Sequence, residues 1–439
     1  MNTNTNTNTH IKFLDYLIKK HKLLNINNDI IIEMLDLIIK YVNDNICQII
    51  YTDLNNIIYH EIYNILFIQY IETDAMSNIL NVDKNVSISI FKKYIKISFS
   101  IIFKYFIPKR SYQKTYIRHK TLSILYKNII QNKINYLKNI IQPEQRTDEW
   151  YIFRNSTLTA SNIWKIFFSE SSQSQLILEK CEPLQINKFK VTNYNSPLHW
   201  GQKYEPVSIL YYEYLNKTKV SEFGCIPHAE HKYIAASPDG IVCDENSLLF
   251  GRMLEIKNVV SREITGIPKM EYWIQMQIQM EVCDLNECDF LETKFVEYEL
   301  EEDYISDKTT EYKGIIMQFY KDNVPHYEYA PIMLNDLESD DYKEWYNEQI
   351  NKNKDIEYIR NIYWKLETIS CVLVLRNKFW FKNIQPSIKA FWEILLYERT
   401  TEKYKDRIKK KRKYENDEFK QINHIPSGCL IDTNMFKNV

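Results

Sequence analysis

Glycine is scarce in this chain, with only 7 among 439 residues. Five of the seven fall in one stretch, between residues 201 and 266. Glycine permits backbone conformations that other residues resist, so the turns that need such conformations are expected in that stretch. The rest of the chain is expected to be mostly helical.

Long apolar runs are absent as well. A membrane-spanning helix needs about 18 or more apolar residues in a row, and the closest candidate, residues 95–107, is interrupted by Lys96 and Lys104. The N-terminal sequence MNTNTNTNTH has no apolar region of a secretory signal and is typical of a disordered leader. The 8 cysteines are therefore expected to be reduced thiols of a soluble, intracellular protein without a membrane partner.

The chain also lacks an excess of charge of either sign. The chain has 56 Lys and Arg against 57 Asp and Glu, so its net charge is −1. Any surface that binds nucleic-acid phosphates must then be a local patch. A hydrophobic fraction of 45% provides ample material for cores, and the length indicates two or three domains.

Composition divides the chain into segments. Residues near the start almost lack Gly and Pro and repeat apolar side chains at helical spacing, as in Ile31, Met34, Leu35 and Ile38. Pro143 and the polar residues after it mark a boundary. The predicted segments are a leader at 1–10, a helical domain at 11–142, a mixed α and β core at 143–334, a helical region at 335–413 and a polar tail at 414–439.

Two stretches are rich in basic residues. Residues 109–138 hold eight Lys and Arg interleaved with four Tyr, a pattern that can follow a nucleic-acid backbone. The same pattern also fits a solvated helix face with tyrosines packed beneath it. The run at 409–413 is either a phosphate contact or nuclear address, or simply a solvated chain end.

Within the predicted core, periodicity indicates several elements. Helices are expected at 204–215 and 271–282, and strands at 233–236, 241–243 and 253–260.

Two short motifs in this core concern chemistry, Ser237-Pro238-Asp239-Gly240 and Leu254-Glu255-Ile256-Lys257. Glu255 and Lys257 are two residues apart, so on a strand they project from the same face. A hairpin would bring Asp239 beside Glu255. Two carboxylates with an ammonium nearby suit phosphodiester hydrolysis with Mg²⁺, which prefers oxygen ligands.

An E-x-K pattern alone is weak, because Glu and Lys often alternate on exposed strands. Here the neighbours Met253, Leu254 and Ile256 are apolar and predict a buried strand. Burying Glu255 and Lys257 costs several kcal/mol unless they are paired or bound to a metal. We therefore expect both residues to be functional.

These motifs resemble the core of PD-(D/E)xK nucleases. More narrowly, the chain resembles the lambda exonuclease and YqaJ viral recombinase family, which has a Trp, then an Arg, then an L/I-T-A-S segment, a W-G-x-x-x-E helix and a Y-x-x-Q-x-Q helix. The matching residues are Trp150, Arg154, Leu158-Thr159-Ala160-Ser161, Trp200 to Glu205 and Tyr272 to Gln277.

The resemblance implies a role for each matched position. Glu205, Asp239 and Glu255, with the backbone carbonyl of Ile256, would hold Mg²⁺ or Mn²⁺. Lys257 would act on the attacking water, and Gln275 would position that water or the lysine. Arg154 and Ser161 would bind a phosphate of the DNA end.

Each role has an alternative. Glu205 could be an exposed helix carboxylate, and Gln277 and Gln279 compete with Gln275. Arg154 could pair with Glu149 or Asp148. Ser161 could cap a helix at 162–168, a role compatible with phosphate binding because helix N-termini attract phosphates.

Other metal chemistry is not expected. His199, His228 and His231 lie near the motifs in the sequence, but the carboxylates suit Mg²⁺ or Mn²⁺ better than Zn²⁺, and we expect all three histidines to be exposed. Some related nucleases hold an iron–sulfur cluster with four cysteines. This chain has no tight cysteine run, so no such cluster is expected.

The expected fold is α+β, or mixed α/β, with a restriction-endonuclease-like central sheet flanked by helices. The expected function is a Mg²⁺-dependent exonuclease that degrades duplex DNA from its ends, 5′ to 3′, in viral recombination, repair or DNA processing. The expected partners are double-stranded DNA, further copies of the chain, and a recombinase or helicase. A viral protein would work in the host cytoplasm or a viral factory. The alternatives are a structure-selective or restriction-like endonuclease, as in CRISPR-associated nucleases, and a non-catalytic DNA-binding module.

Overall fold

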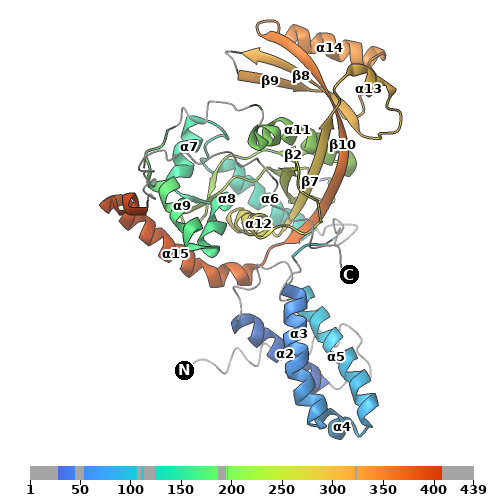
Figure 1. The fold of residues 1–439 in the computed structure, drawn as a ribbon, viewed down its shortest axis with the longest axis vertical. Helices are drawn as coiled ribbons and strands as arrows, with labels where there is room; N and C mark the ends of the chain where they lie inside the picture. Colours follow the sequence, from blue (N-terminus) through green and yellow to red (C-terminus); the bar gives the residue numbers. More distant parts are fainter. Residues whose placement is uncertain are drawn as a thin grey trace, which may run out of the picture.

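The computed structural model describes residues 28–44, 54–105, 110–112, 124–185, 194, 196–321 and 324–407. Figure 1 shows a helical bundle at one end, a central body of mixed helices and strands, and an extension of strands and helices at the other end. The leader at 1–10, the basic run at 409–413 and the tail at 414–439 lie outside the described residues.

The N-terminal bundle is built from amphipathic helices. Its elements are α2 (Asn28–Asp44), α3 (Leu54–Phe67), the π-helical turn η2 (Ile68–Glu72), α4 (Ala75–Leu80) and α5 (Lys84–Tyr105). Ile31, Leu35 and Ile38 of α2 are fully buried, and α2 packs mainly against α5. The helical spacing of the apolar residues in the sequence therefore predicts the buried face correctly.

The central body contains a mixed sheet of seven strands in the order β2-β5-β6-β7-β10-β8-β9. The strands are β2 (Val220–Ser221), β5 (Gly240–Val242), β6 (Met253–Asn258), β7 (Glu287–Glu297), β10 (Glu357–Leu375), β8 (Lys313–Lys321) and β9 (Val324–Tyr329). Within this sheet, as far as its residues are described, β6 and β7 pair in parallel and the other neighbours are antiparallel. A smaller sheet is formed by β1 (Leu158–Thr159), β4 (Ile234–Ala236) and β3 (Ile226–Pro227). This confirms the expected mixed α/β fold.

Helices α11 (Pro197–Asn216) and α12 (Met270–Val282) cover opposite faces of β6. Leu254 and Ile256 pack in the same cluster as Tyr212 of α11, whereas Met253 packs with residues of α12. Successive side chains of a strand point to opposite faces, so Glu255 and Lys257 lie on the α12 side with Met253.

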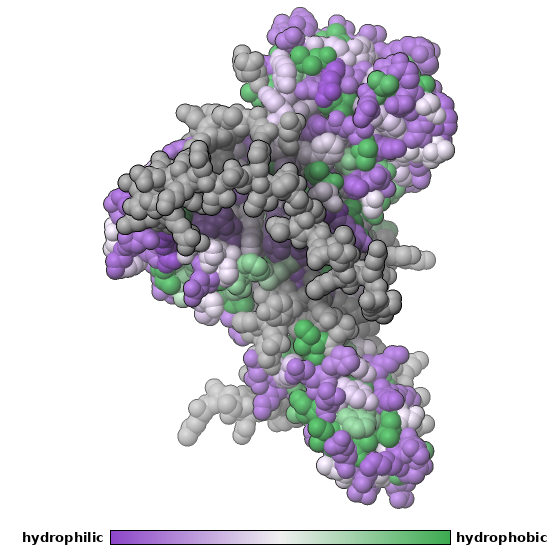
Figure 2. Space-filling view, viewed as in Figure 1, coloured by the Kyte–Doolittle hydropathy of each residue, from purple (hydrophilic) through white to green (hydrophobic). Residues whose placement is uncertain are grey.

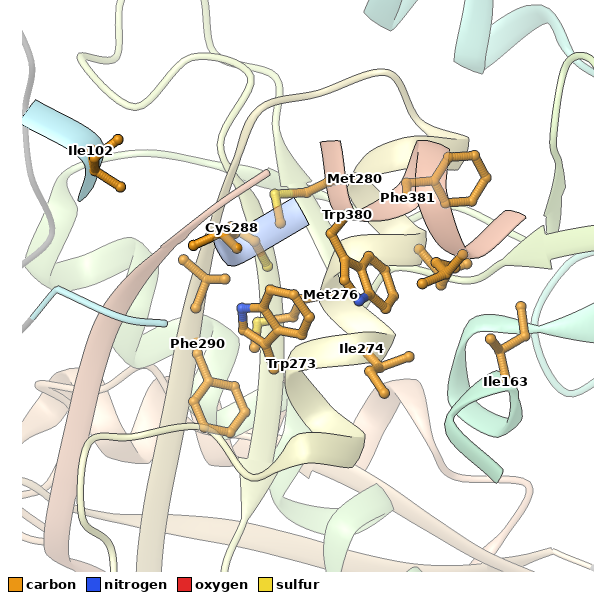
Figure 3. Close-up of a cluster of buried hydrophobic side chains, with 14 of the residues drawn as sticks. Ile102, Ile163, Trp273, Ile274, Met276, Met280, Cys288, Phe290, Trp380 and Phe381 are labelled. Atoms are coloured by element: carbon orange, nitrogen blue, oxygen red, sulfur yellow. The ribbon is translucent and has the colours of Figure 1, made fainter. Parts of the chain in front are cut away.

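Further helices surround α12. They are α7 (Asp148–Asn155), α8 (Ala160–Ile163), the 3-10 turn η3 (Trp164–Phe167), α9 (Glu170–Cys181), α15 (Lys378–Thr401) and the 3-10 turn η4 (Lys403–Arg407). Figure 3 shows Trp273 and Met276 of α12 in one buried cluster with Trp380 of α15 and Phe290 of β7. This packing holds α12, and so the residues on its inner face, against the sheet.

Helix α6 (Ile124–Asn139) falls in the range predicted as the N-terminal helical domain, yet it contacts the central body. A Cβ on Gly251 would lie 2.5 Å from Ile130, so the backbone there approaches α6 very closely. Lys133 forms an ion pair of 2.8 Å with Asp284, and Lys127 donates to the carbonyl of Glu245 at 3.1 Å. These two lysines of the basic stretch serve packing. Residue 109 and residues 113–123 of that stretch are not among the described residues.

The prediction that the chain is helical from residue 335 onward is wrong for β10. Helix α14 (Asp340–Lys352) and helix α15 fit it, but β10 runs for 19 residues between them and pairs with both β7 and β8. Its sequence EYIRNIYWKLETISCVLVL is rich in aromatic and β-branched residues, which favour a strand. The central sheet therefore extends beyond residue 334.

The extension of the molecule consists of β8, β9, the first part of β10, α14 and the short helix α13 (Glu301–Ser306) (Figure 1). Tyr304, Ile315 and Tyr342 form a separate buried cluster there. Among the described residues, no helix combines the length and the apolar character needed to cross a membrane.

Candidate active site

The site is built around the β5–β6 hairpin that the two motifs predicted. Gly240 pairs with Leu254 in antiparallel register, which places Asp239 next to the E-x-K strand. A Cβ on Gly240 would lie 2.1 Å from the side chain of Val220, so only glycine allows β2 to approach at this point. The side chain of Asp239 accepts a hydrogen bond of 2.7 Å from the backbone N–H of Ile256. The hairpin thus fixes one carboxylate beside the next strand.

Glu255 is fully buried, and two side chains satisfy its carboxylate. Lys257 forms an ion pair with Oε1, and the amide of Gln279 donates to Oε2 at 2.7 Å. Burial by itself would lower the pKa of Lys257, but the carboxylates of Glu255 and Asp239 raise it above its usual value. Lys257 is therefore held as an ammonium that donates hydrogen bonds.

Negative charge is in excess at this point. Burial, and then the charge of Glu255, hold the pKa of Asp239 well above its usual range, against the opposing effect of Lys257. Burial also raises the pKa of Glu205, although Arg146 and Lys257 oppose the shift. Closely spaced carboxylates resist losing all their protons unless a further cation joins them.

Glu205 reaches the site from α11. The helix begins at Ser196, whose hydroxyl accepts from the N–H of His199 at 3.1 Å. The amide of Asn258 on β6 donates to the carbonyl of Gly201 at 2.9 Å, which attaches this part of the helix to the strand. The carboxylate of Glu205 pairs with Arg146 at 3.1 Å. Glu205 is half-buried, so the alternative of a freely exposed helix carboxylate does not hold.

The carboxylates border two cavities. The catalytic cavity, of about 520 Å³, is lined by Glu205, Asp239, Ile256 and Lys257 together with Arg146. A second cavity, of about 450 Å³, shares Glu205, Asp239 and Arg146 but lies toward Glu144 and Glu222. Residues from four distant parts of the sequence thus meet at one opening to solvent.

The donor set suits a hard divalent cation, because carboxylates and backbone carbonyls are the ligands such ions prefer. In the described part of the chain, no group of three or more His, Cys, Asp or Glu side chains is arranged as around a metal ion. Instead, Glu255 pairs with Lys257 and Glu205 with Arg146. Burial raises the pKa of Asp239 and of Glu205, and the charge of Glu255 beside them adds to both shifts. This crowding of carboxylates is the feature that fits an added cation.

Arg154 and Ser161 lie together, as expected for a shared ligand. The guanidinium of Arg154 donates to the hydroxyl of Ser161 at 2.9 Å and lies 4.2 Å from the ring of Trp150. Trp150 in turn donates to the hydroxyl of Ser237 at 3.2 Å, in the turn that carries Asp239. This chain of contacts fixes the Arg154–Ser161 pair relative to the carboxylates.

Ser161 is not the helix cap that was considered as its alternative role. Thr159 is the N-cap residue of α8, and it forms a capping box with Asn162. The amide oxygen of Asn162 accepts from the N–H of Thr159 at 3.0 Å. Because the cap lies two residues earlier, the hydroxyl of Ser161 is exposed and points to Arg154.

On α12 the structure brings Gln279, not Gln275, into contact with Glu255. Gln277 bonds instead to backbone atoms of Leu375 and Asn377. Tyr272, Gln275 and Gln279 share one helix face, because they are three and four residues apart. Gln275 is thus on the face toward the site, but it forms no hydrogen bond to a site carboxylate among the described residues.

Two residues of the site were given no role by the motifs: Arg146 lies outside them, and Tyr272 is only the first residue of the Y-x-x-Q-x-Q match. Arg146 precedes α7 with a φ of 69°, a conformation in which a non-glycine residue stores strain. Tyr272 lies 5.2 Å below the ammonium of Lys257. The QRTDE run before Trp150 was interpreted only as a boundary, since nothing in it shows that Arg146 pairs with a residue on α11.

The expectation that the three histidines are exposed is wrong. His199 is 6% exposed and its Nε2 lies 2.8 Å from the hydroxyl of Tyr327. His228 is 7% exposed, and its Nδ1 accepts from the N–H groups of Glu230 and His231 at 3.1 Å. His231 is half-buried. His228 and His231 line a turn against α15, which the sequence does not place beside them.

A mixed sheet with an acid in the turn before one strand and an E-x-K sequence on the next is the arrangement from which the PD-(D/E)xK class takes its name, and this chain has that arrangement. Residues 149–286 match the model of the YqaJ-like viral recombinase domain. The matched range includes Glu205, Asp239, Glu255 and Lys257.

A curated relative is an uncharacterized protein of Acanthamoeba polyphaga mimivirus, 31% identical over 367 residues. The match covers 73% of this chain and 63% of that protein, so the chain spans less than two thirds of its length. Solved structures with similarity include an alkaline exonuclease of Laribacter hongkongensis (21% identity, TM-score 0.34, 59% of this chain and 98% of that one). Another is a phage-related exonuclease of Haemophilus somnus (13% identity, TM-score 0.30, 56% and 95%). These TM-scores are low, so the site itself is the stronger guide.

Proposed function

We propose that this protein is a DNA exonuclease that hydrolyses phosphodiester bonds from duplex ends, 5′ to 3′, with Mg²⁺ or Mn²⁺. The observation that supports it most is the meeting of Glu205, Asp239 and Lys257 at one cavity. The fully buried Glu255 pairs with Lys257 beside them, so the site holds more negative charge than the nearby cations balance. A buried, crowded carboxylate set at a solvent-accessible cavity is typical of a functional site.

A bound divalent ion would supply a water of lowered pKa and neutralise charge on the phosphate. Glu205, Asp239, Glu255 and the carbonyl of Ile256 are the groups that would hold it. The ammonium of Lys257 would leave Glu255 to orient the attacking water or to stabilise the developing charge. Gln279 would keep the Glu255 carboxylate in place through its hydrogen bond of 2.7 Å.

The Arg154–Ser161 pair supports action at an end. A guanidinium and a hydroxyl side by side can together bind a terminal phosphate. Because Trp150 ties this pair to the turn of Asp239, the end would be held at a fixed distance from the scissile bond. Such an anchor selects the terminal nucleotide and agrees with attack from a phosphorylated 5′ end.

The proposed setting is viral recombination, repair or DNA processing. The family of the domain and the giant-virus relative support it. The isoleucine, asparagine, lysine and tyrosine bias also agrees with an AT-rich genome. Double-stranded DNA is the proposed substrate, and further copies of the chain or a recombinase or helicase are the proposed partners.

The test uses linear duplex DNA labelled on one strand and closed circular DNA, each with and without Mg²⁺. We expect the linear DNA to shorten from its 5′ ends only with the metal and the circle to stay intact. Cleavage of the circle would instead favour an endonuclease with the same residues. Tight DNA binding without cleavage of either substrate would favour a binding module.

A further inference from the structure

The first half of α11 separates two cavities. Gly201, Gln202 and Glu205 line the catalytic cavity, whereas Trp200 and Lys203 line a neighbouring cavity of about 410 Å³. Residues three or four apart share a helix face, so Gly201 and Gln202 each lie on the side of Glu205, whereas Trp200 and Lys203 share another face. Pro197 and Val260 border both cavities, so the cavities adjoin.

The second cavity, here the aromatic pocket, is lined mainly by aromatic and polar side chains. Its other wall comes from the extension, with Gln318 and Tyr320 of β8, Tyr327 of β9 and Arg360 of β10. The volume lies in the range of small-ligand sites, and flat aromatic walls favour a flat aromatic occupant.

The pocket also offers polar groups without partners. The Nε1 of Trp200 and the Nδ1 of His199 are buried and have no hydrogen-bond partner in the described part of the chain. Lys203 is neutralised by Glu297. Arg360 donates only to the amide oxygen of Gln318, at 3.2 Å, and has no ion pair among the described residues. An occupant with hydrogen-bonding edges and a negative charge nearby would satisfy these groups.

The two cavities that adjoin the catalytic cavity differ in charge. The cavity toward α6 adds Glu144 and Glu222 to Glu205 and Asp239, with Lys138 and Arg146 as its cations. The aromatic pocket has Glu297 as its carboxylate, and Lys203 already pairs with it. A phosphodiester backbone that leaves the catalytic cavity is repelled less on the side of the aromatic pocket.

We propose that the aromatic pocket binds one unpaired nucleobase of the DNA strand whose backbone passes the carboxylates. This inference rests on the proposed function for the path of the strand. Tyr320 and Tyr327 provide aromatic surfaces against which a base stacks, Trp200 and His199 meet its edge, and Arg360 faces the adjoining phosphate. Stacking on aromatic side chains accepts any base, so the pocket selects single-stranded DNA by structure and not by sequence.

The test measures binding in the Lys257→Ala variant, which separates affinity from cleavage. The probe is a labelled duplex with a single-stranded overhang, in which one abasic site is moved along the overhang a nucleotide at a time. We expect one position at which the missing base weakens binding roughly 5- to 100-fold. Adding Tyr320→Ala should weaken binding of the intact overhang by a similar factor and abolish the effect of the abasic site at that position.

Two controls sharpen the result. Tyr320→Phe keeps the ring and should restore the positional effect. Tyr358→Ala removes a ring from the opposite face of the extension, where the ring centroids of Tyr358 and Phe319 are 5.6 Å apart. In the Lys257→Ala background this variant should bind like Lys257→Ala alone. If Tyr320→Ala does not fold, Arg360→Gln should weaken binding and reduce its salt dependence by about one ion. An equal abasic effect with and without Tyr320, or no position that matters, would overturn the proposal.

Base binding by the aromatic pocket and nuclease activity can fail independently of each other. If the wild-type protein failed to cleave linear DNA but the positional effect remained, the proposed nuclease activity would be rejected and base binding by the aromatic pocket would stand. Cleavage without any positional effect would do the reverse.

Discussion

Two buried charge clusters lie side by side on β6 and β7, and they are organised in opposite ways. The site cluster consists of Glu205, Asp239, Glu255 and Lys257. The Arg252 cluster consists of Arg252, Glu287 and Asp289, joined by the hydroxyl of Tyr212. Both place carboxylates in the sheet. The site cluster borders the cavity of about 520 Å³, whereas Arg252 and Asp289 are 3% and 0% exposed.

The Arg252 cluster is complete. Arg252 donates to Asp289 at 2.7 Å and to Glu287 at 2.8 Å, and Tyr212 donates to the other oxygen of Asp289 at 2.7 Å. Burial would lower the pKa of Arg252, but Asp289 and Glu287 raise it. A satisfied cluster of this kind stabilises one arrangement of the chain, whereas an unbalanced one beside a cavity is prepared for a ligand.

The largest effect is expected from removing the charge of Asp239, a proposed metal ligand in the site cluster. Asp239→Asn keeps the acceptor for the N–H of Ile256 but removes the charge, so turnover on linear DNA should fall by roughly 10³-fold or more. Circular dichroism should show an unchanged fold. Residual cleavage within tenfold of wild type would take Asp239 out of the site cluster.

Substitution in the Arg252 cluster should lower the stability of the protein instead of its turnover. Arg252→Ala leaves the buried Asp289 without its cation, which costs about 3 to 5 kcal/mol of unfolding free energy. Denaturant unfolding measures this loss, and cleavage per folded molecule should change little. A specific loss of turnover in a stable Arg252→Ala protein would contradict the division between the two clusters.

Lys257 lies between these cases, because its ammonium both balances Glu255 and faces the catalytic cavity. Lys257→Ala should lower turnover by roughly 10²- to 10³-fold with little change in DNA affinity. Single-turnover cleavage and binding should be compared on the same duplex. Wild-type turnover in this variant would remove the lysine from the mechanism.

Arg154 extends the comparison to the substrate end. Arg154→Ala should weaken the use of 5′-phosphorylated ends by roughly 10- to 100-fold, as expected for one lost charge-assisted hydrogen bond. Ends without the phosphate should be affected far less. An equal loss on both kinds of end would exclude a role in phosphate recognition.

The residues that the sequence predicted best are those placed by local geometry. The two-residue spacing of Glu255 and Lys257 and the turn at Asp239 need only one hairpin, and that hairpin is present. Strand β10 was missed because pairing with β7 and β8, far away in sequence, decides its conformation. Helical spacing alone cannot show such partners.

Finer details depend on contacts across the fold. Gln275 and Gln279 share a helix face, and the tilt of α12 on the sheet decides which of them meets Glu255. The pairing of Arg146 with Glu205 joins segments 59 residues apart. His199 is buried beside Tyr327 of β9, and no pattern near His199 in the sequence predicts that this strand lies there.

The smallest expected effect is on the unfolding free energy, which the buried charge of Asp239 lowers. The pKa of Asp239 is raised, so the folded state favours its protonated form, and the associated stability is present below the unfolded pKa of about 3.9 and lost as pH rises through the folded value. At pH 8 the unfolding free energy of the Asp239→Asn protein should therefore be roughly 1 kcal/mol higher than that of wild type, and the difference should shrink toward pH 4.

Added Mg²⁺ should raise the melting temperature of wild type by mass action and leave that of the Asp239→Asn variant nearly unchanged. Asp289→Asn is the matched control. Burial raises the pKa of Asp289 as well, but Arg252 and Tyr212 bind its carboxylate, so losing that charge should destabilise the protein at pH 8 with or without Mg²⁺. If both substitutions shifted stability in the same direction, the two clusters would not differ in charge balance.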